Sequence, residues 1–493
     1  MPRASRPRTL GALKETGYRP VSIREEVHRN LMRKIAAGEE LFPGIIGYRD
    51  TVVPEVENAL LAGQSVIILG ERGQAKSRLV RSMTALLDEE IPIIAGSETN
   101  DDPCTPVSAY GRQKLAAEDD DLAIDWIPRE ARYGEKLATP DVSMADLIGD
   151  VDPIKVAEGR YLGDELTMHY GLLPRTNRGI FCVNELPDLS ERIQVGLFNL
   201  MEERDIQIRG YTIRLPLDVL IFATANPEDY TNRGRIITPL KDRFGAQVRT
   251  HYPLNTEDEL SIVQQERLRF DGTEKRVVVP DYMSEVVSEI SALARASPEV
   301  NQRSGVSVRV SIANFETMRS AALRRGLRHG EDISSPRITD LPAVASSMRG
   351  KIELETFEDG REDAVIEQLT KQAIANVFGR RFAPGELDRV VTSFEQGSAV
   401  QTGADIESSG YVQVRDSVAG LAPVVEKLGG SGSAAETASA VEFVLEGLHL
   451  ERKLNRDQVA GGYAYRRSVQ AASVEPGSRE LWRRRRQRDS RED

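Results

Sequence analysis

The sequence predicts a parallel α/β domain followed by a helical region, and three observations support this prediction. Short apolar segments alternate with helical patterns over residues 26–252, as expected when helices connect parallel strands. A glycine-containing loop separates the apolar segment 66–69 from a helical pattern, which is the setting of a phosphate-binding loop. After residue 253, helical patterns dominate to about residue 395. The 493-residue chain is therefore expected to contain an α/β nucleotide-binding core with flanking helices, followed by an all-α lid domain and a helical C-terminal extension.

The strands of the core are expected where short apolar runs occur, because such runs are typical of strands buried on both faces. Residues 190–203 predict an amphipathic helix, and the alternating segment 205–215 predicts a hairpin. The expected strands are 66–69, 91–95, 179–185, 219–226 and, at an edge, 247–252. The helices expected behind the core are 283–296, 311–325, 340–350 and 363–378.

Shifts in composition predict the domain organisation around this core. Residues 1–25 are basic and are expected to form a flexible N-terminus. The polar segment 97–140 is expected to be a surface insertion, partly ordered at best. Residues 253–395 are predicted to form the helical lid domain. Residues 396–493 are expected to hold a Gly/Ser/Ala-rich linker, one helix at about 434–454 and a basic tail.

Composition also limits the classes of function. The formal net charge of −12 argues against a nucleic-acid-binding protein, although the basic ends are either solvated or a tether to an acidic partner or RNA. Cys104 and Cys182 lack metal-ligand spacing, so neither a disulfide framework nor a zinc site is expected. No apolar run has the length of a membrane span, and no apolar stretch follows the basic first residues. A cytoplasmic protein is expected.

The loop after the first strand reads G-x-x-G-x-x-K-S and predicts a phosphate site, although a chance strand–turn–helix has the same pattern. Successive backbone N–H groups and the positive end of the helix dipole would face phosphate oxygens. Lys76 is expected to contact the β- and γ-phosphates, and the Ser77 hydroxyl to bind Mg²⁺. Ala75 replaces the usual glycine, and a right-handed φ is expected there. The expected nucleotide-binding residues of the loop are Gly70, Glu71, Arg72, Gly73, Gln74, Ala75, Lys76, Ser77 and Arg78.

Two polar residues end neighbouring apolar strands and are candidates for the chemistry of hydrolysis. Glu185 follows one strand and Asn226 another, and ligands of open parallel sheets bind beyond these carboxyl ends. Hydrolysis needs an oriented water, a metal ion and charge compensation. Glu185 is expected to polarise the attacking water, and Asn226 to hold that water or contact the γ-phosphate. Either residue alone could instead be a turn residue or a helix cap.

Together these motifs resemble the AAA+ ATPases, specifically the clade of the magnesium chelatase I subunit and the MoxR-type proteins. The resemblance extends over roughly residues 40–350. The loop 70–77 resembles a Walker A motif, residues 183–185 the end of a Walker B motif, and residues 223–228 a sensor-1 segment. Residues 146–178 are similar to the helix-2 insert of chelatase-type proteins. An AAA+ core is therefore expected.

The resemblance implies further site residues and partners. Ile45 and Ile46 lie in a segment similar to one that packs on adenine. Arg243 resembles the arginine that reaches the γ-phosphate of a neighbouring subunit, and Arg309 resembles sensor 2 of the lid. ATP and Mg²⁺ are the implied cofactors. The implied assembly is a homo-oligomeric ring, a hexamer, and the implied partner is a protein with a von Willebrand factor A domain.

One position departs from the family pattern, which has aspartate where this chain has Asn184. Mg²⁺ prefers anionic oxygen ligands, so an amide at the metal site is expected to weaken metal binding. Ser77 and the phosphates still supply ligands, so ATP binding is expected to survive, with turnover either slow or normal. An Asn184→Asp change is expected to raise the affinity for Mg²⁺.

Three functions are compatible with this sequence. The first is an ATP-hydrolysing ring motor that remodels or metallates a partner protein. The second is the motor subunit of a magnesium chelatase that inserts Mg²⁺ into protoporphyrin IX; Asn184 and the long extension after about residue 350 count against it. The third is a nucleotide-gated scaffold or transcription co-regulator with little turnover, although the G-A-F-T-G-A sequence of sigma-54 activators is absent.

Overall fold

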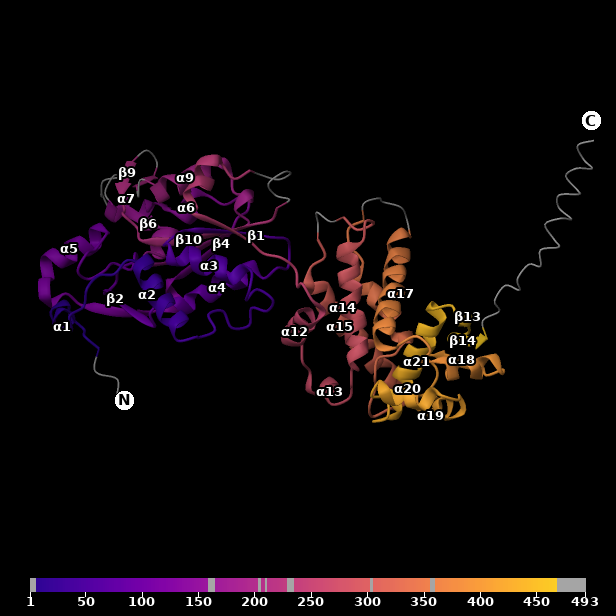
Figure 1. Ribbon diagram of the computed structural model, residues 1–493. Coiled ribbons are helices and arrows are strands. Elements are labelled where there is room, and N and C mark those ends of the chain that lie inside the picture. The colour runs from indigo at the N-terminus through magenta and orange to yellow at the C-terminus, as the bar shows by residue number, and fades with distance from the viewer. Residues whose placement is uncertain are drawn as a thin grey trace, which may run out of the picture. The chain divides into compact units, whose positions relative to one another are not determined.

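The computed structural model describes residues 6–157, 165–202, 205–208, 211–227, 235–301, 305–354 and 360–467. The chain divides into two units. The first comprises residues 1–258 and 303–307, and the second comprises residues 259–302 and 308–493. The first unit contains the α/β core, and the second contains the long helices α14, α15, α17 and α21 (Figure 1).

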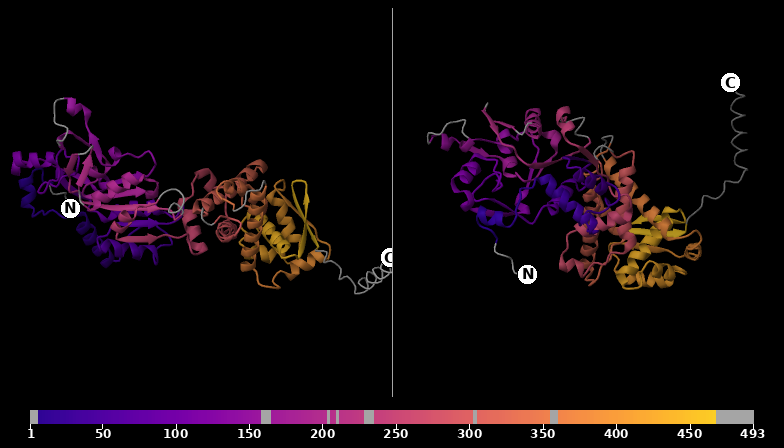
Figure 2. Two further views of the ribbon diagram at one scale, coloured as in Figure 1. Left: turned by 90° about the horizontal axis from the view of Figure 1, so that it is seen from above. Right: turned by 60° about the vertical axis from the view of Figure 1, so that its left-hand side comes forward.

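The first unit is built around a five-stranded parallel sheet with the strand order β11-β1-β10-β7-β4 (Figure 2, left). Leu69 is opposite Ala225, and Val183 is opposite Ala223, so the carboxyl ends of the three central strands lie at one edge. The strands are β1 (Val66–Leu69), β4 (Tyr133–Leu137), β7 (Gly179–Asn184), β10 (Val219–Ala225) and β11 (Ala246–Arg249). The parallel α/β core expected from the sequence is confirmed.

Helices cover both faces of this sheet. Val66 and Ile68 of β1 point into one hydrophobic cluster, and Ile67 and Leu69 into the other, which is why all four positions are apolar. One face is covered by α2 (Ile23–Ala36), α3 (Val52–Leu61) and α4 (Lys76–Ser82). The other is covered by α8 (Leu172–Arg175), α9 (Glu191–Glu202) and α11 (Thr238–Arg243).

Residues 97–140 belong to the fold of the first unit, and their expected role as a surface insertion was wrong. They contain α5 (Ala109–Glu118), β3 (Ile124–Pro128) and the edge strand β4 of the parallel sheet. The expected strand at 91–95 is β2 (Glu90–Ile94), but it pairs antiparallel with β3 outside the main sheet. An edge strand has one neighbour and a more exposed surface, so β4 needs no continuous apolar run and gives a weak sequence signal.

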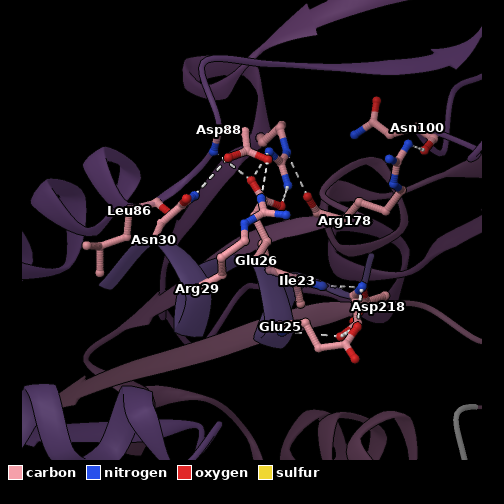
Figure 3. Close-up of polar contacts among 12 residues, drawn as sticks. Ile23, Glu25, Glu26, Arg29, Asn30, Leu86, Asp88, Asn100, Arg178 and Asp218 are labelled. Atoms are coloured by element: carbon pink, nitrogen blue, oxygen red, sulfur yellow. Dashed lines mark hydrogen bonds and ion pairs between the residues drawn. The ribbon is translucent and has the colours of Figure 1, made fainter. Parts of the chain in front are cut away.

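A buried ion pair holds the chain at the start of β4. The Arg132 guanidinium donates to both carboxylate oxygens of Glu26 on α2, at 2.7 and 2.6 Å, and the two side chains are 1% and 5% exposed. The Asp88 amide donates to the same carboxylate of Glu26 (Figure 3). Arg132 Nε donates to the carbonyl of Arg178. Such a pair is tolerated in the interior because additional hydrogen bonds, from the Asp88 amide to Glu26 and from Arg132 to the Arg178 carbonyl, help to offset the loss of solvation.

The first residues of the described chain are folded, so the flexible N-terminus expected at 1–25 was wrong for residues 6–25. The helix α1 (Leu10–Glu15) packs on the segment before β3, where the Leu10 amide donates to the Leu122 carbonyl at 2.9 Å. Leu10 and Leu122 form a small buried cluster with Ile94. A short apolar pair is enough to order this basic segment because its partner surface is provided by residues about 110 positions away.

Two short antiparallel pairs project from the core. The segment 146–178 contains β5 (Gly149–Val151) paired with β6 (Met168–Tyr170), and residues 158–164 lie outside the described residues. The predicted hairpin at 205–215 is confirmed as β8 (Asp205–Ile208) and β9 (Tyr211–Arg214). None of the helices within the described residues combines the length and apolar character needed to cross a membrane.

The second unit begins with the helices expected from the sequence. Three of the four patterns predicted between 283 and 378 lie within an observed helical segment, and the fourth, 340–350, extends two residues beyond the end of its segment at Met348. The segments are α14 (Asp281–Ala296), α15 (Val308–His329), a 3₁₀ segment and α16 (Ile338–Met348), and α17 (Arg361–Arg381), preceded by α12 (Thr256–Glu266) and α13 (Asp271–Glu274).

The region after residue 396 is folded, so the expected linker at its start was wrong. It follows α18 (Asp388–Glu395) and contains β12 (Val400–Gly403), α19 (Ser408–Ser417) and α20 (Leu421–Lys427). The predicted helix is α21 (Ala434–Leu450), and β13 (Leu454–Val459) and β14 (Gly462–Arg467) complete a sheet of order β12-β14-β13. Small residues allow close packing here: a Cβ on Gly447 would lie 2.0 Å from the Phe378 ring. The predicted basic tail lies outside the described residues after residue 467.

Candidate functional site

The loop between β1 and α4 has the close backbone packing that its glycines predict. A Cβ on Gly70 would lie 1.8 Å from Thr250 Oγ1, and a Cβ on Gly73 would lie 1.9 Å from Ser307 Oγ. Gln74 Oε1 accepts hydrogen bonds from the Glu71 amide at 3.0 Å and from Thr250 Oγ1 at 2.7 Å. The loop therefore packs against Thr250, directly after β11, and against Ser307, and only glycine fits at its two tightest positions.

Ala75 adopts a left-handed backbone conformation, with φ 54° and ψ 18°, where a right-handed one was expected. Ala75 occupies the position that is usually glycine in this motif, and its backbone has the left-handed conformation that favours glycine. The chain must turn sharply at residue 75 because α4 begins at Lys76, directly under the loop. A non-glycine residue in this region costs about 1–2 kcal/mol, so the loop stores backbone strain.

Lys76 and Asn226 lie together at the carboxyl ends of the strands. Lys76 Nζ donates to the carbonyl oxygens of Gly70 at 2.6 Å and Glu71 at 3.0 Å, and to Asn226 Oδ1 at 2.6 Å. Asn226 Nδ2 donates to Glu185 Oε2 at 2.8 Å. A continuous polar chain therefore connects the loop lysine to the predicted catalytic carboxylate through the predicted sensor residue.

Glu185 is held in a second left-handed conformation, with φ 56° and ψ 48°. Its amide donates to Thr224 Oγ1 at 3.1 Å. Strained non-glycine residues persist where the surrounding structure over-determines them, and they are common at functional sites. The turn directs the Glu185 side chain toward Asn226 instead of continuing β7.

Ser77 and Asn184, the two residues predicted to bind the metal ion, lie within hydrogen-bond distance of each other. Ser77 Oγ donates to Asn184 Oδ1 at 3.1 Å, and Thr224 Oγ1 donates to the same oxygen at 3.2 Å. A hydroxyl oxygen and an amide carbonyl oxygen at this spacing are the kind of donors that Mg²⁺ accepts, with phosphate and water completing its shell. The residues present therefore fit a nucleotide-bound Mg²⁺.

Glu135 is a site residue that sequence reasoning missed. Its carboxylate accepts from Asn184 Nδ2, from Arg81 Nε at 2.7 Å and Nη2 at 2.8 Å, and from the Tyr133 hydroxyl at 3.1 Å. Burial raises the pKa of Glu135, but the hydrogen bonds from Arg81 outweigh it and hold the pKa below its ordinary value. The sequence did not indicate Glu135 because it lies on the edge strand β4, within the polar segment 97–140 that was predicted to be a surface insertion.

The segment expected to pack on adenine lies beside the loop. Ile45 packs on the hydrophobic cluster that includes Phe42, and Ile46 is partly exposed. The Tyr48 hydroxyl contacts the Gln74 carbonyl oxygen at 2.8 Å, so this segment is attached to the loop. A cavity of about 410 Å³ adjoins the loop; it is lined by Leu69, Gly70, Glu71, Gln74, Pro227, Gln247, Arg249 and Thr250.

Two predicted nucleotide-binding residues remain. Arg72 lies in the loop, and its carbonyl accepts a hydrogen bond from the Tyr252 hydroxyl at 3.0 Å, whereas Arg78 lies on α4. Arg309 lies on α15 in the second unit.

Arg243 is not brought to this cluster within the first unit. It ends α11, forms an ion pair with Glu202 at 2.6 Å and lies over the Phe198 ring. It lines a cavity of about 360 Å³ with Ser65 and Val219, at the amino ends of β1 and β10. Lys76 lies at the opposite ends, a strand length of roughly 13 Å away for the four residues of β1.

Curated sequences with significant similarity are magnesium-chelatase subunits. Magnesium-chelatase subunit ChlI-2 of Arabidopsis thaliana is 29% identical over 224 residues, which cover 43% of this chain and 48% of that protein. The ChlI subunit of Nicotiana tabacum is 29% identical over 266 residues (50% and 56%), and that of Guillardia theta is 30% identical over 220 residues (42% and 55%). The chain thus spans about half the length of the curated relatives it matches. No family model matches the chain.

Comparison with solved structures gives weaker likenesses. A putative ATPase from Cytophaga hutchinsonii is 16% identical with a TM-score of 0.30, covering 72% of this chain and 97% of that chain. NtrX from Brucella abortus in complex with ATP is 17% identical with a TM-score of 0.40, covering 79% and 72%. These scores are too low to add to the sequence relationship.

Proposed function

Because the curated relatives of this chain are magnesium-chelatase I subunits, we propose that it is an AAA+ protein of the magnesium chelatase I subunit and MoxR-type clade, that it binds ATP with Mg²⁺ at the loop 70–77, and that it hydrolyses ATP. The observation that supports this most directly is the polar chain from Lys76 through Asn226 to Glu185. In this chain, Lys76 is a cation that can bind phosphate, Asn226 is an amide that can contact the γ-phosphate, and Glu185 is a carboxylate that can polarise the attacking water.

The described side chains divide the work of phosphoryl transfer to water. Lys76 Nζ exchanges the Asn226 oxygen for phosphate oxygens, which releases Asn226 to face the γ-phosphate. Glu185 then orients and polarises the attacking water, while the backbone amides of the loop hold the phosphates. Mg²⁺, when bound, would neutralise charge on the phosphate oxygens, and Ser77 and Asn184 are the residues that would hold it.

The active assembly is proposed to be a homo-oligomeric ring, a hexamer. Arg243 lies at the amino ends of the strands, away from its own loop, so it could contact a nucleotide only in another subunit, after leaving its ion pair with Glu202. An arginine supplied in this way stabilises charge in the transition state. Arg309, on α15, would have the role of sensor 2 of the lid.

ATP turnover in the ring is proposed to remodel or metallate a partner protein with a von Willebrand factor A domain. A second candidate is a motor subunit of a magnesium chelatase that inserts Mg²⁺ into protoporphyrin IX, favoured by the relatives, which are such subunits by name. A nucleotide-gated scaffold with little turnover is the third, and Asn184 at the proposed metal site is the observation that favours it.

The test is phosphate release from ATP by the purified full chain, compared with the Glu185→Gln variant. The amide keeps the size of the side chain and its contact with Asn226 but cannot act as a base, so the variant should bind ATP and release phosphate at least 100-fold more slowly. Equal rates for the two proteins would exclude Glu185 as the catalytic carboxylate.

The same variant separates the candidate functions. Held with ATP, it should retain its partner from native lysate, and the identity of the captured protein distinguishes a von Willebrand factor A domain partner from the other subunits of a chelatase. A wild type that binds ATP but releases no phosphate even with the captured partner would favour the scaffold.

A further inference from the structure

The amide group of Asn184 has a single orientation that satisfies its neighbours. Two hydroxyls, Ser77 Oγ and Thr224 Oγ1, contact one of its terminal atoms, and because a hydroxyl can donate or accept, the orientation is decided by the contact of the other terminal atom. The other terminal atom faces the Glu135 carboxylate, which only accepts, and must be the amide nitrogen. A side chain that could otherwise flip is thus held with its oxygen toward Ser77.

Glu135 is itself fixed in place on β4. Arg81 on α4 grips its carboxylate with two parallel hydrogen bonds, and the Tyr133 hydroxyl provides a third. Bidentate arginine–carboxylate pairs add geometric specificity as well as energy. The Glu135 side chain is only 19% exposed, so solvent replaces these contacts poorly. A chain of contacts therefore runs from α4 through β4 and β7 back to Ser77 at the start of α4.

We infer that Glu135 is a positioning residue for the Mg²⁺ site of the nucleotide. By accepting a hydrogen bond from the Asn184 amide nitrogen, it makes the uncharged Asn184 side chain suitable as a neighbour of the metal ion. The carboxylate that the family pattern places at position 184 has a counterpart one strand away, at position 135. Glu135 directs the Asn184 carbonyl oxygen at Ser77 and adds negative charge behind it, while Arg81 keeps that charge fixed. This inference rests on the proposed binding of Mg²⁺ with ATP.

The geometry changes the expected result of Asn184→Asp. Considered alone, a carboxylate at position 184 should hold Mg²⁺ more tightly. In this structure it would lie within hydrogen-bond distance of the Glu135 carboxylate, with no proton between them. Two carboxylates sharing one site repel each other, so the single substitution should destabilise the protein and gain little metal affinity. Adding Glu135→Gln returns one amide and one carboxylate to the pair.

The experiment is a double-substitution cycle on the full chain with Asn184→Asp, Glu135→Gln and both together. Binding of a fluorescent ATP analogue is measured in EDTA and over a Mg²⁺ titration, and thermal unfolding is measured without nucleotide. Glu130→Gln is the matched control, because Glu130 is an exposed carboxylate shortly before β4.

Three results are expected. Glu135→Gln should raise the Mg²⁺ concentration at half-saturation about fivefold, because a charge-assisted contact to Asn184 becomes a neutral one. Asn184→Asp should lower the unfolding temperature by about 2–4 °C. The double variant should recover that temperature and need no more Mg²⁺ than the wild type, while affinities in EDTA stay within about twofold for all variants.

The outcomes separate this inference from the proposed function. If Asn184→Asp alone lowers the Mg²⁺ requirement, and Glu135→Gln changes neither this effect nor the unfolding temperature, then the inference is overturned while the proposed function stands. A wild type whose nucleotide binding is unaffected by Mg²⁺ would overturn the proposed function and the inference with it.

Discussion

Lys76 contacts three oxygen atoms of the site, the carbonyl oxygens of Gly70 and Glu71 and the Asn226 Oδ1. We predict that Lys76→Ala lowers the affinity for ATP by about 10- to 100-fold, because charge-assisted hydrogen bonds contribute about 1.5–3 kcal/mol. Isothermal titration calorimetry measures the change, with Lys114→Ala as the control, since Lys114 is a partly exposed residue on α5. Unchanged affinity in Lys76→Ala would contradict the assignment of the phosphate loop.

The strained backbone at Ala75 gives a second prediction at the scale of one residue. Ala75→Gly should stabilise the folded state by about 1–2 kcal/mol, because glycine adopts the left-handed conformation without a steric penalty. It should also stabilise the unfolded state by about 0.4–1 kcal/mol, because glycine has more conformational entropy there. A net gain of about 0.5–1 kcal/mol in the free energy of unfolding is expected from urea denaturation. Ala116→Gly, in the right-handed helix α5, should instead lose about 1 kcal/mol. Equal losses for both variants would mean that Ala75 is not strained.

At the scale of the elements, one carboxylate connects α13 to its neighbours. Glu274 accepts from Arg267 Nη1 at 2.6 Å and Nη2 at 3.0 Å, and from Arg319 Nη1 of α15 at 2.8 Å. The hydrogen bonds from Arg267 are the main cause of a Glu274 pKa lowered to about 2. A lowered pKa in the folded state means that the contacts stabilise the fold above the unfolded pKa, about 4.3, and that this contribution is lost as pH falls through about 2.

The corresponding prediction concerns pH. Glu274→Gln should reduce the free energy of unfolding by about 1 kcal/mol near neutral pH, a modest value because the side chain is partly exposed. The difference from wild type should stay constant above pH 5 and shrink steadily between about pH 4 and 2. Urea unfolding at a series of pH values checks this, with Glu395→Gln at the end of α18 as the control. A difference that does not change with pH would exclude the ionised carboxylate as its cause.

At the scale of the whole molecule, the separation of Arg243 from Lys76 predicts a site shared between subunits. Arg243→Ala should bind ATP with near-normal affinity and lose about 10³-fold or more in hydrolysis, because the arginine acts on a neighbour's nucleotide. Mixing Arg243→Ala with Glu185→Gln subunits should restore some activity, since certain interfaces then pair an intact Glu185 with an intact Arg243.

Light scattering with ATP at micromolar protein concentration provides the matching measurement of assembly. A wild type that stays monomeric and still hydrolyses ATP would rule out the shared site. Loss of the Glu202 ion pair could also affect the fold, so Glu202→Gln is the control and should keep its activity within a few-fold.

The sequence by itself determined the features that depend on local pattern. Four consecutive apolar residues before a glycine loop specify a buried strand and the turn after it, which is why β1, Lys76 and Ser77 lie where they were predicted. Glu185 and Asn226 follow from the same rule, because parallel strands bring their carboxyl ends to one edge. The long helices α14, α15 and α17 were also predictable from their apolar periodicity.

Only the tertiary structure decided the features that depend on distant partners. The edge strand β4 lacks an apolar run and exists because β7 supplies its hydrogen bonds, so Glu135 was invisible as a neighbour of Asn184 until the strands were paired. The left-handed turn at Ala75, directly before α4, goes against the preference of alanine itself, in a loop that packs closely on Thr250 at Gly70 and on Ser307 at Gly73. In the same way, the Gly/Ser/Ala-rich region after residue 396 folds because α19 and α20 pack on α21; a Cβ on Gly430, before that helix, would lie 2.9 Å from the Ala440 Cβ. Local propensity is weak at each of these positions, and burial against a partner far along the chain outweighs it.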